Sequence, residues 1–286
     1  MNNSNKINWF PGHMAKTRRE ITESLKLVDL VVEIIDARIP ISSRNLEIAS
    51  LTNGKPKILV LNKTDLAPDH LLNLWKNFYS KQNMVCVLYS SKDASSRNRF
   101  MTTAKEVMKE KLDSWKRKGI LGRKIRAMVL GIPNVGKSSF INHLCKNAKA
   151  KVENKPGVTK RNQWFSLGSE MELLDTPGVL WPNLDNQEIA CNLAITGAIK
   201  NSILDLEDLA YFFIDKVKDE NILTQRYKLT PEESQGTAYE ILNSIGKKRG
   251  FLISGGGVDT FKTSKMILEE FRNGKLGKIV LERPEV

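Results

Sequence analysis

The segment that most restricts the fold is GIPNVGKS at residues 131–138, which directly follows the apolar run IRAMVLG at 125–131. It fits the pattern G-x-x-x-x-G-K-[ST], in which a loop between a strand and a helix wraps a phosphate with its backbone N–H groups. The residues after the loop, SFINHLCK, read as a helix. This strand–loop–helix context predicts an α/β fold with a phosphate-binding loop.

The residues of this loop have distinct expected roles. Gly131 and Gly136 let the backbone approach a phosphate without a clash from a Cβ atom. Lys137 is expected to hold the β- and γ-phosphates, and Ser138 to ligate Mg²⁺. The predicted phosphate-binding residues of the loop are Asn134, Val135, Gly136, Lys137, Ser138 and Ser139.

Two later segments extend the predicted phosphate site. DTPG at 175–178 follows the apolar run MELL, and an Asp at a strand end near a phosphate loop typically holds Mg²⁺, so Asp175 is a candidate ligand. Gly178 can offer its N–H to the γ-phosphate. Thr159 lies in the polar loop KPGVTKR, and a Thr there can close over Mg²⁺ and release after hydrolysis.

Guanine recognition is predicted upstream of the phosphate loop, in NKTD at 62–65. A carboxylate at Asp65 can accept from guanine N1–H and its 2-amino group, whereas adenine has neither donor. Asn62 suits bridging within the site, and the stem of Lys63 can lie over the base. The loop YSSK at 89–92 follows another apolar run and is expected to meet guanine O6 through Ser90, Ser91 and Lys92.

Six short apolar runs, rich in Val, Ile and Leu, predict strands. Because such runs suit strands that are covered on both faces, a mostly parallel sheet with helices on both faces is expected. The tight turn GSE predicts that the last two strands form an antiparallel hairpin. The predicted strands are 30–37, 57–62, 84–89, 125–131, 162–167 and 171–176.

The pattern changes after about residue 185. Apolar residues of LEDLAYFFIDKV at 206–217 recur at helical spacing, and the stretches 231–250 and 258–275 also read as helices with glycine stops. The sequence therefore predicts two domains, an α/β domain at 1–185 and a small all-helical domain at 186–286.

Taken together, NKTD, SSK, GIPNVGKS, Thr159 and DTPG are the five motifs of a GTPase, with the last two placed first. The chain thus resembles a circularly permuted Ras-like GTPase. WFPGHMAKTRRE at 9–20, DARIP at 36–40 and LLDTPGVLWP at 173–182 narrow the resemblance to the YlqF-type bacterial GTPases, the ribosome biogenesis GTPase A family. The similarity is specific over residues 7–200 and more diffuse beyond them.

The resemblance implies a late role in assembling the large (50S) ribosomal subunit. It also implies a helical domain that contacts rRNA and a GTPase activity that the subunit stimulates. Because the Gln that usually orients the water is missing, we expect a low intrinsic rate, and we expect hydrolysis to release the protein from the subunit. A non-catalytic, GTP-dependent RNA-binding module is the alternative. Because of the permutation, the chain passes directly from DTPGVLWP into the helical domain. We therefore expect the nucleotide-dependent switch to be coupled to this RNA-binding domain.

The charge agrees with a polyanionic partner. The net charge is +13, and residues 97–126 hold eleven Lys and Arg against three acids, a local balance of +8. We expect rRNA rather than DNA as the partner. The chain has neither an apolar run of membrane-spanning length nor an N-terminal secretory signal, and its three scattered cysteines suit a reducing environment, so a cytoplasmic protein without a membrane partner is expected.

The residue that activates water is not supplied by the usual motif. Val179 follows DTPG where Ras-like enzymes usually carry a Gln nearby. His13 is the best candidate, since a histidine can position or deprotonate water near neutral pH, and in the resembling family this histidine is a proposed catalytic residue. The alternative is that the N-terminal segment only docks on the domain. Asn134 either helps bind K⁺ beside the phosphates, as in related GTPases, or only shapes the turn.

Overall fold

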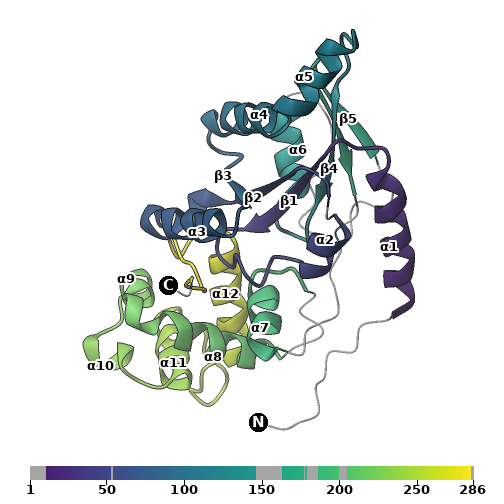
Figure 1. The fold of residues 1–286 in the computed structure, drawn as a ribbon. Helices are drawn as coiled ribbons and strands as arrows, with labels where there is room; N and C mark the ends of the chain where they lie inside the picture. The colour runs from purple at the N-terminus through teal and green to yellow at the C-terminus, as the bar shows by residue number, and fades with distance from the viewer. Residues whose placement is uncertain are drawn as a thin grey trace. The chain divides into compact units, whose positions relative to one another are not determined.

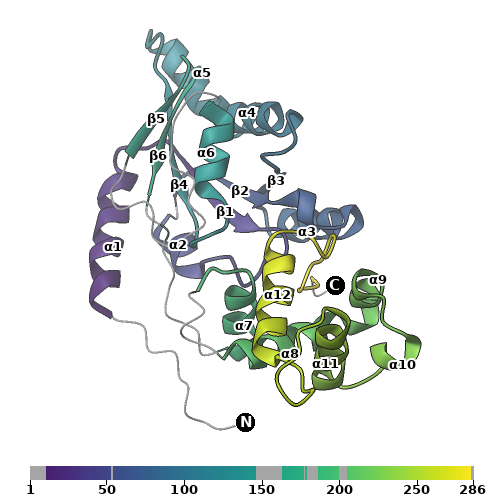
Figure 2. The same ribbon diagram turned by 180° about the vertical axis from the view of Figure 1, so that it is seen from behind.

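The chain divides into two compact units. The computed structural model describes residues 11–52, 54–145, 163–176, 178, 186–199 and 205–284, without the side chains of 11–17, 48 and 49. Of the described residues, those between 11 and 178 and residues 282–284 form the sheet unit, and those between 186 and 281 form the helical unit (Figures 1 and 2). The sequence-based boundary at residue 185 stays a prediction, and it did not anticipate that residues 282–284 group with the sheet unit.

Among the described residues, six strands form one sheet in the order β3-β2-β1-β4-β6-β5. All neighbouring strands are parallel except β5 and β6, which pair as the expected antiparallel hairpin. Each strand lies within one residue of its apolar run, because the run is what a doubly covered sheet buries. The strands are β1 (Leu30–Asp36), β2 (Lys57–Asn62), β3 (Val85–Leu88), β4 (Ile125–Leu130), β5 (Gln163–Leu167) and β6 (Met171–Asp175).

The strand order creates a switch point in the middle of the sheet. From central β1 the chain adds β2 and β3 on one side, and β4 then pairs with the other side of β1. The five parallel strands end at the same edge of the sheet, where α/β proteins bind ligands. The segments that follow β1, β2, β3, β4 and β6 are therefore brought to one edge.

Helices cover both faces of this sheet, as predicted. Helix α1 packs Ile21 and Leu25 against Val31, Met128 and Leu174 on one face. Helix α6 lies in front of the sheet in Figure 2 and behind it in Figure 1. Every residue of β1 is buried, which requires cover on both faces. The helices are α1 (Pro11–Leu25), α2 (Leu46–Leu51), α3 (Asp69–Lys81), α4 (Ser95–Val107), α5 (Lys109–Arg117) and α6 (Lys137–Cys145), with a 3-10 turn η1 (Thr64–Leu66).

The helical unit is built around α8, which packs against α7, α11 and α12. Phe213 of α8 and Phe271 of α12 have ring centroids 4.9 Å apart in its core. No helix in the described part of the chain is both long and apolar enough to span a membrane. The elements are α7 (Gln187–Ile195), α8 (Leu206–Val217), η3 (Lys218–Glu220), α9 (Ile222–Tyr227), α10 (Pro231–Ser234), α11 (Ala238–Lys248) and α12 (Thr260–Arg272).

Candidate functional site

The phosphate loop connects β4 to α6, and its glycines sit where side chains do not fit. A Cβ atom at Gly131 would lie 2.6 Å from the backbone oxygen of Ile34 in β1. Gly136 has a φ of 94°, and a Cβ atom there would collide with the side-chain amide of Asn62. The loop is therefore pressed against β1 and against the residue that ends β2, which brings the two predicted halves of the site together.

Lys137 is buried at the start of α6. Its ammonium donates to the backbone oxygens of Gly131 at 3.1 Å and Ile132 at 3.3 Å, both within the phosphate loop. Burial lowers the pKa of Lys137 to about 8, although the charge of Asp175 partly opposes this shift. The lysine is thus held at the loop in a setting where an anion would favour its charged form.

This lowered pKa predicts that nucleotide affinity depends on pH. As the pH rises through 8, Lys137 loses its proton in the free protein, while a bound polyphosphate favours the protonated form, so binding must take up a proton. We expect GDP affinity to fall by up to roughly tenfold per pH unit above pH 8. Titrations of the protein with fluorescent GDP between pH 7 and 9 would measure this change in affinity.

Lys137→Arg is the matched control, because a guanidinium keeps its charge over this range. It is expected to bind more weakly but with a flatter pH profile. An equally steep profile in this variant would assign the dependence to another group.

The predicted guanine residues lie together at the ends of β2 and β3. Asp65, in η1, accepts from the Ser90 hydroxyl at 2.8 Å and forms an ion pair with Lys92 at 2.8 Å. Burial acts to raise the pKa of Asp65, but the hydrogen bonds from Lys92 and Ser90 outweigh it and lower the pKa. Asp65 is therefore kept as a carboxylate, the form that accepts two hydrogen bonds from guanine. Ser91 is an exposed turn residue beside them.

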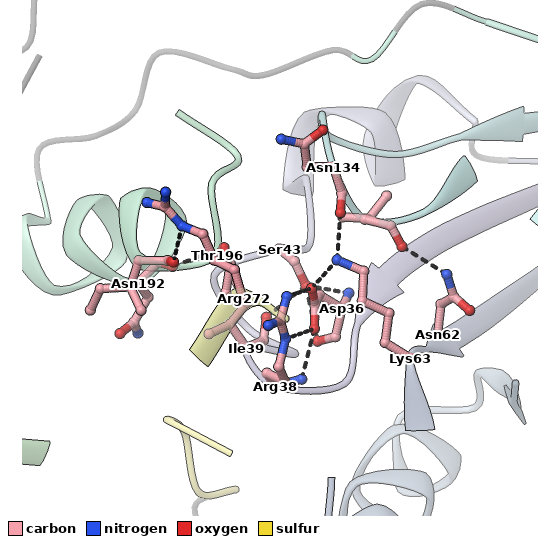
Figure 3. A network of polar contacts seen from close by, with 12 residues as sticks. Asp36, Arg38, Ile39, Ser43, Asn62, Lys63, Asn134, Asn192, Thr196 and Arg272 are labelled. Carbon is pink, nitrogen blue, oxygen red and sulfur yellow. Dashed lines mark hydrogen bonds and ion pairs between the residues drawn. The ribbon is translucent and has the colours of Figure 1, made fainter. Parts of the chain in front are cut away.

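Asn62 and Lys63 join this base site to the phosphate loop. The Asn62 amide donates to the backbone oxygen of Val135 at 2.8 Å, and the Lys63 ammonium donates to that of Asn134 at 2.5 Å (Figure 3). Lys63 has a left-handed backbone, with φ of 62°, as does Asn134, with φ of 61°. The bridging predicted for Asn62 is thus a direct contact between the two motifs.

Sequence reasoning used DARIP only as a family marker and missed the structural part that it plays. Asp36 ends β1 and is buried, and its carboxylate accepts from the guanidinium of Arg38 at 3.0 and 2.8 Å and from the ammonium of Lys63 at 2.8 Å (Figure 3). Burial acts to raise the pKa of Asp36, but the charges of Arg38 and Lys63 hold it below the ordinary value. Asp36 therefore binds the same ammonium of Lys63 that donates to the phosphate loop. An Asp at the end of a strand beside the phosphate-loop strand was the available signal.

The predicted Mg²⁺ ligands that are described fit a hard cation. Asp175 is buried at the end of β6, and its charge acts on Lys137. Ser138 lies in the first turn of α6. Hydroxyl and carboxylate oxygens are the donors that Mg²⁺ prefers. Gly178 lies against the same loop, since a Cβ atom there would be 3.0 Å from the Lys137 ammonium. Thr159 lies outside the described residues.

The histidines differ in their surroundings. His13 belongs to α1, but its side chain lies outside the described part of the chain. His143 is engaged by the hydroxyl of Tyr89 at 2.7 Å, in an aromatic cluster with Phe140. His70 is exposed in the first turn of α3. Of the two competitors, one is tied to a core hydroxyl and the other faces solvent.

Known proteins match this chain along almost all of its length. A family model described as 50S ribosome-binding GTPase matches residues 126–246, starting at the phosphate-loop strand. Ribosome biogenesis GTPase A of Bacillus pumilus is 46% identical over 98% of this chain and 99% of its own length. The Thermotoga maritima protein of that name is 30% identical over 98% of this chain and 95% of its own length.

Two solved structures of YlqF from T. maritima are also similar. The GDP-bound one has a TM-score of 0.66 at 25% identity and covers 94% of this chain and 100% of that chain. The GNP-bound one has a TM-score of 0.64 at 26% identity and covers 94% of this chain and 99% of that chain. They confirm the predicted permuted GTPase fold, and with the full-length relatives they lead to one assignment. This chain belongs to the ribosome biogenesis GTPase A family, whose members are GTP-hydrolysing proteins of ribosome assembly.

Proposed function

We propose that this protein binds GTP through the predicted site residues, acts on the large (50S) ribosomal subunit or its precursor, binds rRNA and is released on hydrolysis. The observation that carries the nucleotide part is the direct contact of Asn62 and Lys63, in the same NKTD motif as Asp65, with the phosphate loop. Asp65 is charged and positioned at the same sheet edge as Lys137, so one guanine nucleotide can engage both. One of the two YlqF structures of T. maritima is bound to GDP and the other to GNP, which supports this assignment.

The phosphate end of the proposed site contains the switch. Asn134, Val135, Gly136, Lys137, Ser138 and Ser139 hold the phosphates, while Ser138, Thr159 and Asp175 hold Mg²⁺, which neutralises phosphate charge. We expect the γ-phosphate to order Thr159 and the segment around Gly178, and hydrolysis to release them. The proposal includes a K⁺ ion that binds beside Asn134. Equal GTP turnover in KCl and NaCl at matched ionic strength would refute this K⁺ site.

A basic surface on the sheet unit supports an RNA partner. Lys109, Arg117 and Lys118 are exposed on α5 and just after it, and no ion pair is recorded for them among the described residues. Next to them Arg123 lies over the ring of Trp115, with its guanidinium carbon 4.4 Å from the centroid. This surface adjoins the start of β4, whereas the phosphate loop follows its end. A phosphate backbone can therefore contact it without blocking the nucleotide site.

Binding and turnover with purified large subunits test the proposal. We expect co-sedimentation with a non-hydrolysable GTP analogue but not with GDP, and faster GTP turnover when subunits are added. Turnover that the subunits leave unchanged would favour the non-catalytic RNA-binding module instead. Binding that is the same with both nucleotides would reject release on hydrolysis.

The triple variant Lys109→Ala, Arg117→Ala and Lys118→Ala tests the RNA surface. Each lost phosphate contact lowers the slope of log K against log salt by about 1, so a decrease of up to about 3 is expected. Lys26→Ala, Lys76→Ala and Lys81→Ala together remove the same charge from exposed positions elsewhere on the sheet unit. If the two triple variants had equal slopes of log K against log salt, this surface would not be part of the RNA interface.

A further inference from the structure

A carboxylate near the C-terminus is built into the sheet unit. Glu282 is only 9% exposed. It groups with the sheet unit, whereas Leu281, the residue before it, groups with the helical unit. The chain thus passes from the helical unit back into the sheet unit across a single peptide bond.

Glu282 binds the turn that follows β1. Its Oε2 accepts from the backbone N–H of Ile41 at 2.6 Å, and its Oε1 accepts from the backbone N–H of Ser42 at 3.0 Å and from the Ser42 hydroxyl. Hydrogen bonds to an ionised carboxylate are roughly twice as strong as bonds between neutral groups. One buried side chain therefore holds two consecutive backbone donors and a hydroxyl of this turn.

The same turn supports Asp36. Next to Ser42, the N–H of Ser43 donates to the backbone oxygen of Ile39 at 2.9 Å, and the Ser43 hydroxyl accepts from the backbone N–H of Asp36 at 2.9 Å. The backbone N–H of Arg38 donates to the Asp36 carboxylate at 3.0 Å. Both the backbone and the carboxylate of Asp36 are thus fixed by the turn that Glu282 binds.

From Asp36 the contacts reach the nucleotide site. Its carboxylate holds the ammonium of Lys63, which donates in turn to the backbone oxygen of Asn134 in the phosphate loop. Every step from Glu282 to the phosphate loop is a hydrogen bond or ion pair, or lies between adjacent residues. A continuous network of this kind can carry energetic coupling between separate sites.

We propose that Glu282 is a positioning residue for guanine-nucleotide binding, acting through the 39–43 turn, Asp36 and Lys63. The proposal rests on the assignment of Asn62 to Asp65 as the guanine site.

Glu282→Gln tests the proposal in the full-length protein. The amide keeps the shape of the side chain but removes the charge and turns one acceptor into a donor. We expect the Kd for fluorescent GDP to rise about three- to tenfold, mainly through faster dissociation. Ser42→Ala, which removes only the hydroxyl, is the milder second variant and should change the Kd in the same direction. Glu269→Gln, at an exposed position on α12, is the matched control.

A double-mutant cycle separates positioning from a purely structural role. If Glu282 acts through Asp36, Glu282→Gln and Asp36→Asn together should weaken GDP binding by less than the product of their separate effects. For the control pair, Glu269→Gln and Asp36→Asn, the combined effect on GDP binding should equal the product of the separate effects. Multiplying effects of Glu282→Gln and Asp36→Asn would overturn the pathway, even if both variants melt at a lower temperature.

The outcomes distinguish this inference from the proposed site. Wild-type protein that does not bind GDP refutes the guanine site itself. If the wild type binds GDP, and Ser42→Ala and any folded Glu282→Gln protein bind it within twofold of the wild-type Kd, the site stands and the positioning role is refuted.

Discussion

Asp65→Asn is expected to weaken GTP binding by at least about a hundredfold, because two hydrogen bonds to a carboxylate are lost at about 1.5–3 kcal/mol each. An amide offers one acceptor oxygen, and its NH₂ group meets a donor of guanine. Xanthine carries a carbonyl in place of the 2-amino group, so the same variant should prefer XTP. Ser90 can still donate to the new amide oxygen, which keeps the loop in place.

Competition of GDP and XDP against a fluorescent nucleotide would measure this exchange of preference. Asp113→Asn is the matched control, because Asp113 is an exposed residue of α5 that pairs only loosely, at 4.0 Å, with Lys116. It should leave both affinities unchanged. An Asp65→Asn protein that binds GDP as tightly as the wild type would show that another group recognises the base.

The strands and the gathering of motifs were predictable, for a local reason. Each strand is an apolar run, and the runs of β2, β3, β4 and β6 are followed by predicted motifs that parallel strands bring to a common edge, as NKTD at 62–65 and GIPNVGKS at 131–138 illustrate. The sheet order follows less directly, because the pairing of β1 with β4 joins residues 97 positions apart, such as Leu30 and Ala127. The apolar runs alone do not indicate this pairing.

In the helical unit, one stretch predicted as a helix is divided into two helices, and the sequence contains a signal for this division. The predicted stretch 231–250 forms α10 and α11, because Thr230 with Glu233 and Thr237 with Glu240 each make a capping box. Both pairs have the T-x-x-E spacing. A search for this spacing would have separated the two helices.

The contacts behind the site could not be predicted from local patterns. Arg38 and Asp36 are two residues apart in a polar turn, and their pairing follows from burial that the sequence does not reveal. Glu282 meets Ser42 from 240 positions away, so no periodicity or motif connects them. Such long-range polar pairs form only when the chain is folded, whereas motif residues can be identified from their spacing in the sequence.

His13→Ala is expected to abolish most of the turnover that large subunits stimulate, while leaving GDP and GTP affinity near the wild-type values. A group that positions or deprotonates water contributes about a hundred- to ten-thousandfold to a rate. The chain has only three histidines, and His143 is bound to Tyr89 while His70 is exposed on α3. Val179, directly after DTPG, has no side-chain group that can hydrogen-bond water. His13 is therefore the histidine left to serve a particle-bound state.

Single-turnover hydrolysis at saturating subunit concentration would measure this loss separately from binding. His70→Ala is the matched control and should keep the stimulated rate, and Val179→Ala should lower it less than His13→Ala, because an apolar neighbour only shields the water. Restoration of stimulated hydrolysis in the His13→Ala protein by added imidazole would identify the missing group as the ring itself. If His13→Ala kept the wild-type stimulated rate, the N-terminal histidine would serve docking alone and the water would have to be positioned by the ribosomal particle.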